Sequence, residues 1–126
     1  MLKYFDGYPH NVDRAVQIWQ ILVGKAHNRQ TVTYGILRDL LGYKGAGVMG
    51  KRLEPIALYC RHHGLPPLTN LVVEKDTGLP SVDLTGNDPN EDREEVFKRE
   101  WFKIYPPTAE DFAKALKRGW DYVPTL

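Results

Sequence analysis

The chain has 126 residues, enough for one domain with a substantial core and too few for two comfortable ones. Hydrophobic residues make up 42% of it and charged residues 26%, an ordinary composition that excludes wholesale disorder. One cysteine excludes an internal disulfide framework, and no apolar run reaches the roughly 20 residues of a membrane-spanning helix. We expect a single domain over residues 1–126, in the cytoplasm because the first residues lack a signal-peptide core, with no membrane partner.

The formal net charge of +1 conceals an asymmetry along the chain. Residues 1–79 carry ten Lys or Arg and six Asp or Glu, a net of +4, whereas residues 80–126 carry seven and ten, a net of −3. Within residues 44–63 four cations face one acid, with two histidines in addition. This balance favours an anionic partner at the central segment, although a strong sequence-independent DNA binder is usually more basic overall.

Hydrophobic spacing predicts a first helix from about Val12 to about Ala26. Residues 31–79 then read as a short helix, a Gly-rich turn, a longer basic helix and a β-hairpin. Thr33 is a good N-cap for the short helix, and Gly42 suits its left-handed C-terminal position. In the longer helix Pro55 removes a backbone hydrogen bond, which predicts a break or a kink.

The hairpin is predicted over residues 71–79, with a turn at 75–78 and a return strand that begins at Leu79. Residues 92–118 form a helical extension. Its first helix runs from about Asp92 to Tyr105, and its second follows Thr108, which can form a weak capping box with Asp111. The predicted fold is therefore mainly α with a small β-hairpin, a winged helix-turn-helix core with extra C-terminal helices.

The stretch VTYGILRDLLGYKGAGVMGKRL resembles the C-terminal DNA-binding domain of the alkylguanine-DNA alkyltransferases and their alkyltransferase-like relatives. The family pattern is roughly V-x-Y-G-x-L-A, a glycine-containing turn, then A-x-R-A-V-G on the recognition helix. The similarity covers about 45 residues. The matching positions are Val32, Tyr34, Gly35, Leu37, Leu41, Gly42, Ala46, Val48 and Gly50.

The resemblance implies a winged helix in which Tyr34 sits beside a DNA phosphate and the helix around residues 46–53 enters a groove. Gly47 stands at the position of the family's intercalating arginine. Independently of the family, Thr33 and Tyr34 lie at a helix N-terminus, which is itself an anion site. The predicted nucleic-acid-binding residues are Thr33, Tyr34, Lys44, Gly47, Lys51, Arg52, Arg61 and Lys75.

The family's reactive Pro-Cys-His-Arg-Val-Val motif is absent, because Leu68-Thr69-Asn70-Leu71 precedes Val72-Val73 here. We therefore predict no alkyl transfer, no catalytic residue and no cofactor. Cys60 lies nine residues before Thr69 on the apolar face of a helix, which is typical of a buried structural thiol. His62 and His63 point about 100° apart on a helix and have no second Cys/His pair at finger spacing, so no metal site is predicted.

Two functions from different classes fit these residues. The first is non-enzymatic binding of nucleic acid, with double-stranded DNA preferred to RNA and affinity that falls steeply with salt. The alternative is a protein-interaction module on the same scaffold, or a homodimer, with contacts through an exposed aromatic cluster around Trp101, Phe102 and Trp120. A third and weaker hypothesis is an enzyme that uses Cys60 or the histidine pair.

Overall fold

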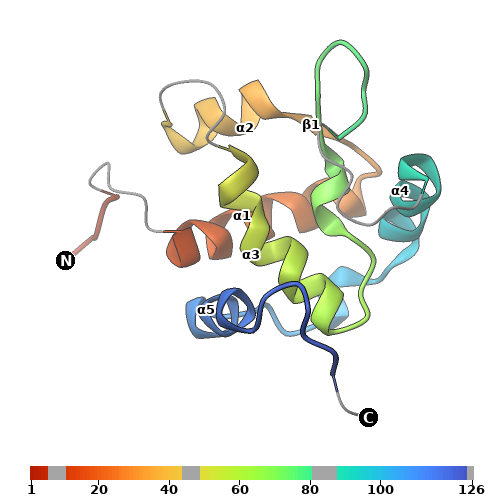
Figure 1. Ribbon diagram of the computed structural model, residues 1–126. Helices are drawn as coiled ribbons and strands as arrows, with labels where there is room; N and C mark the ends of the chain where they lie inside the picture. Colours follow the sequence, from red (N-terminus) through yellow and green to blue (C-terminus); the bar gives the residue numbers. More distant parts are fainter. Residues whose placement is uncertain (6–10, 44–48, 81–87, 125–126) are drawn as a thin grey trace.

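Helices dominate the computed structural model, which describes residues 1–5, 11–43, 49–80 and 88–124 (Figure 1). The α-helices are α1 (Asn11–His27), α2 (Tyr34–Leu41), α3 (Met49–His62), α4 (Pro89–Lys98) and α5 (Ala109–Arg118), with 3-10 turns η1 (Leu68–Leu71) and η2 (Trp101–Lys103). Two short strands, β1 (Val32–Thr33) and β2 (Val72–Val73), complete it. The predicted mainly helical class is confirmed. Among the described helices, none has the length and apolarity needed to cross a membrane.

The core lies where α1, α3 and α5 pack together. Trp19 of α1 is 3% exposed and contacts three other rings edge-on or tilted. Its ring centroid lies 5.6 Å from those of Tyr59 and Trp101, and 6.2 Å from that of Phe112. Such offset pairs add to the free energy gained by burying the rings. These aromatic side chains therefore join the first helix to the last one.

Short-range capping signals in the sequence are confirmed at two helices. The Thr33 hydroxyl accepts a hydrogen bond from the Ile36 N–H at 3.2 Å, and α2 ends at Gly42 with a left-handed φ of 74°. At α5 the Thr108 hydroxyl and the Asp111 carboxylate each accept a hydrogen bond from the other residue's N–H. Each cap satisfies backbone donors that the first turn leaves open, so the start of each helix is fixed.

Of the two outcomes predicted at Pro55, a break or a kink, the break is wrong. α3 continues unbroken from Met49 to His62 with Pro55 inside it. Pro55 is fully buried among the apolar side chains of α3 that face the core, such as Ile56. Packing of this face compensates for the hydrogen bond that proline removes, because tertiary contacts outweigh intrinsic propensity.

The hairpin predicted over residues 71–79 is not found in the described residues, and residues 81–87, into which its return strand would run, lie outside them. β2 pairs in parallel with β1, with Val32 opposite Val72 and Thr33 opposite Val73, and Leu79 belongs to no strand. The backbone at 74–79 instead closes a loop, in which the Glu74 N–H donates to the Leu79 carbonyl oxygen at 2.9 Å. The partner of β2 is therefore a strand forty residues earlier, at the entry to α2.

The fourth helix ends at Lys98 and not near Tyr105, as the sequence predicts. The chain leaves the helix at Arg99 and re-forms as η2, which turns Trp101 inward to 3% exposure. The Trp101 indole N–H donates to the Val96 carbonyl oxygen at 2.8 Å. Burial of this ring stops the helix.

Candidate nucleic-acid interface

The start of α2 and the loop after β2 leave the small sheet at the same edge. Because β1 and β2 are parallel, their carboxyl ends lie together, and Thr33 is opposite Val73. Tyr34 follows directly on one side, and Lys75 follows two residues after Val73 on the other. Tyr34 is half-buried and Lys75 is exposed. The structure thus brings three of the predicted site residues to one edge.

The loop 74–79 is held in shape by several hydrogen bonds. The Gly78 N–H donates to the Glu74 carbonyl oxygen at 2.8 Å, and the Leu79 N–H donates to the Thr77 hydroxyl at 3.1 Å. The Arg93 guanidinium of α4 donates to the Gly78 carbonyl oxygen. Gly78 has a φ of 68°, which a side chain would strain. Lys75 is therefore presented on a defined turn, although two acids flank it.

The first turn of α3 carries the next two predicted cations. Lys51 is exposed and forms no ion pair with any residue in the described part of the chain. Arg52 is half-buried, and its guanidinium carbon lies 4.9 Å from the centre of the Tyr43 ring. The Lys51 side chain is thus accessible to a ligand, whereas the Arg52 side chain also packs against Tyr43 at the N-terminal end of α3.

Tyr43 is a member of the site that the sequence did not single out. Its ring has Arg52 at 4.9 Å and Arg14 at 5.0 Å, and Arg14 also lies 3.6 Å from the ring of Phe5. Cation–π contacts of this kind are favourable when the guanidinium is partly desolvated, as Arg14 is at 9% exposure. These cation–π contacts connect the N-terminal segment, α1 and α3. No local sequence pattern predicts contacts between segments so far apart in the chain.

Two predicted residues, Lys44 and Gly47, lie outside the described residues. Arg61 is described, and the structure separates it from the other cations. It comes ten residues after Lys51, about 15 Å further along the helix at 1.5 Å per residue. Its guanidinium carbon lies 5.9 Å from the centre of the Trp120 ring, at the C-terminal end of α3. Arg61 therefore belongs to a different surface.

Acidic side chains of the C-terminal half pair with other cations. Glu94 accepts two hydrogen bonds from Arg29, at 2.8 and 2.9 Å. Glu100 lies 3.1 Å from Lys103, and Glu95 lies 4.0 Å from Lys98. These contacts involve exposed side chains and are individually weak. None of these three acids forms an ion pair with Lys51.

The aromatic cluster predicted for a protein partner does not form as a surface. Trp101 is buried in the core, Phe102 is 68% exposed, and Trp120 is half-buried beside Arg61. Trp101 therefore cannot contact a partner, and the prediction that it is exposed is wrong.

Cys60 is the buried structural thiol that its position predicts. It is 1% exposed, and burial raises the pKa of the thiol to about 12. A raised pKa keeps the thiol protonated at neutral pH, and the protonated thiol is a poor nucleophile. We expect no reaction with an aromatic disulfide reagent at pH 7, and one equivalent after unfolding in urea. Rapid labelling of the folded protein, absent in Cys60→Ala, would contradict this assignment.

The histidine pair is divided between two environments. His62 is buried, and its Nε2–H donates to the Gly119 carbonyl oxygen at 2.7 Å. His63 stacks against Tyr59 with 4.2 Å between ring centroids, and desolvation lowers the pKa of its ring. Within residues 1–5, 11–43, 49–80 and 88–124, no three His, Cys, Asp or Glu side chains are grouped as metal ligands.

No protein-family description, no curated protein and no solved structure matches this chain.

Proposed function

We propose that the protein binds double-stranded DNA without acting on it chemically. In this proposal α2 and α3 are the two helices of a helix-turn-helix, and the loop 74–79 is its wing. Thr33 and Tyr34 bring the N-terminus of α2 to one phosphate, Lys75 contacts a second, and the first turn of α3 approaches the groove. The resemblance of residues 32–53 to a DNA-binding domain supports the same placement.

The observation that carries the proposal is the exposed Lys51 on the first turn of α3, with no ion-pair partner among the described residues. In Figure 1, α2, the beginning of α3 and the loop that follows β2 lie at one end of the molecule, and α5 and the C-terminus lie at the other. Cations gathered at one end can reach neighbouring phosphates of one duplex. The acids beside Lys75 reduce the local potential, so affinity depends on fit as well as on charge.

A fluorescence-anisotropy titration tests the proposal directly. Labelled duplex DNA, single-stranded DNA and duplex RNA are titrated with the protein at two salt concentrations. We expect the duplex DNA to bind with a dissociation constant of about 10⁻⁴–10⁻⁶ M at physiological salt, and more tightly at lower salt as counterions are released. Equal binding of all three nucleic acids would reject duplex recognition. No salt-dependent binding would reject the function altogether.

A further inference from the structure

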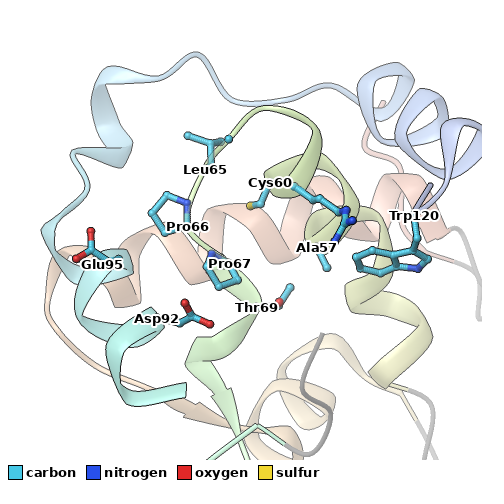
Figure 2. A pocket seen from close by; sticks show the side chains of 11 residues that line it. Ala57, Cys60, Leu65, Pro66, Pro67, Thr69, Asp92, Glu95 and Trp120 are labelled. Atoms are coloured by element: carbon cyan, nitrogen blue, oxygen red, sulfur yellow. The ribbon is translucent and has the colours of Figure 1, made fainter. Parts of the chain in front are cut away.

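A cavity of about 390 Å³ lies at the opposite end of α3 from Lys51 (Figure 2). It is open to solvent on one side and is lined by the last turn of α3, the segment 64–67, η1, one face of α4 and Trp120. Volumes of roughly 300–1,000 Å³ are typical of sites for small ligands. The cavity contains no residue of the proposed DNA interface except Arg61, which the structure separates from that interface.

Thr69 is a polar residue in the wall of the cavity. It is 5% exposed and lines the cavity. A threonine hydroxyl can both donate and accept hydrogen bonds. The Thr69 hydroxyl can therefore form a hydrogen bond with a polar group of an occupant.

Two carboxylates define the charge that such an occupant carries. Asp92 and Glu95 stand three residues apart on α4, so they share a face, and both line the cavity. Asp92 is 8% exposed, and the Asn70 amide, which donates a hydrogen bond to it at 3.5 Å, is one of its partners. Ionised carboxylates accept hydrogen bonds only, so this side of the cavity suits a group with several N–H donors and a positive charge.

The remaining walls of the cavity are apolar or aromatic, and the cationic side chain of Arg61 lies at the end of the cavity away from the two acids. In Figure 2, Pro66 and Pro67 lie between the two acids and Trp120, so an aliphatic stem can run along them. The half-buried Trp120 ring forms the far wall, with the Arg61 guanidinium 5.9 Å from its centre. Arg61 repels a second positive charge at this end and favours a carboxylate or a carbonyl oxygen.

We propose that this cavity binds a guanidinium or ammonium group on an aliphatic stem whose far end is not cationic. This is the chemistry of arginine or lysine, either as a free amino acid or as a side chain in a peptide. The side-chain oxygens of Asp92, Glu95 and Thr69 accept hydrogen bonds from the N–H groups of the ligand's cation. Pro66, Pro67 and Trp120 contact its aliphatic stem, and Arg61 lies near its far end. The proposal does not depend on DNA binding.

Titration of ¹⁵N-labelled protein with N-acetylarginine, followed by NMR, tests the site. We expect saturable shifts of the Thr69 amide and the Trp120 indole. N-acetylcitrulline has the same shape without the charge and should cause none of these shifts. Agmatine, which is cationic at both ends, should bind at least about tenfold more weakly than N-acetylarginine. Equal binding of the citrulline derivative, or no saturable shift with any of these probes, would overturn the proposal.

Variants then assign the contacts. Thr69→Val and Glu95→Gln should each weaken binding of N-acetylarginine about tenfold, the effect of losing one hydrogen bond or one charge. Thr69→Ser keeps the hydroxyl and should bind normally, and Glu110→Gln makes the same charge change as Glu95→Gln at an exposed position on α5. Unchanged affinity in both Thr69→Val and Glu95→Gln would reject the site. A capped Gly-Arg-Gly peptide that binds more tightly than N-acetylarginine identifies a peptide side chain, and the reverse order identifies the free amino acid.

Discussion

Charge reversal at Lys51 and Lys75 together is expected to weaken binding to duplex DNA about a hundredfold at low salt. Both ammonium groups are exposed at the end of the molecule that carries α2 and the loop after β2. Each substitution removes a phosphate contact and adds a repulsive carboxylate. The slope of log K against log salt concentration should also fall by about two, because two fewer counterions are released. Anisotropy titrations of the Lys51→Glu/Lys75→Glu variant over a salt series measure both quantities.

The control for this experiment is Lys114→Glu/Lys117→Glu. These lysines are exposed on α5 at the other end of the molecule, and their reversal changes the net charge by the same amount. We expect it to reduce affinity less than about threefold through the long-range field alone. An equal loss in the two double variants would mean that the whole charge of the protein, and not this surface, governs association. Arg52 is left unchanged because its contact with Tyr43 would confound binding with stability.

Interactions that span three or four residues were predictable from the sequence. Thr33 and Thr108 are caps because their hydroxyls reach an N–H three residues later, and Gly42 accepts a left-handed conformation that other residues avoid. The bounds of α1 and α5 follow from such local signals together with apolar periodicity. Cys60 was identified as buried for the same reason, since it lies on an apolar helical stripe.

Contacts between distant segments were not predictable, and the errors occur there. Val72 pairs with Val32, forty residues earlier, so its β-forming character was correctly recognised but its partner was not. The sequence predicts that Trp101 lies on a continued helix, whereas α4 ends at Lys98 and the Trp101 ring packs against Trp19. The cavity around Thr69 likewise joins α3, η1 and α4, which no single stretch of sequence brings together.

Trp19→Ala is expected to lower the free energy of unfolding by about 3–5 kcal/mol, the range for truncating a buried aromatic side chain to alanine. The ring is 3% exposed and contacts Tyr59, Trp101 and Phe112, so its removal leaves a cavity between α1, α3 and the last two helical segments. A domain of this size is stable by about 5–15 kcal/mol, so the variant approaches the limit of folding. Urea unfolding followed by circular dichroism measures the midpoint and slope.

Phe102→Ala is the comparison, because it also removes an aromatic ring, smaller than the indole, from a position that is 68% exposed. The Phe102 ring contacts His27 edge-on, with 5.3 Å between centroids, and a change at such a surface position should cost less than about 1 kcal/mol. Because helices α1, α3 and α5 meet at Trp19 and not at Phe102, the two variants separate the core from the surface. Equal destabilisation by both variants would mean that the rings of Trp19, Tyr59, Trp101 and Phe112 are not the centre of the core. Other contacts would then hold α5 against α1.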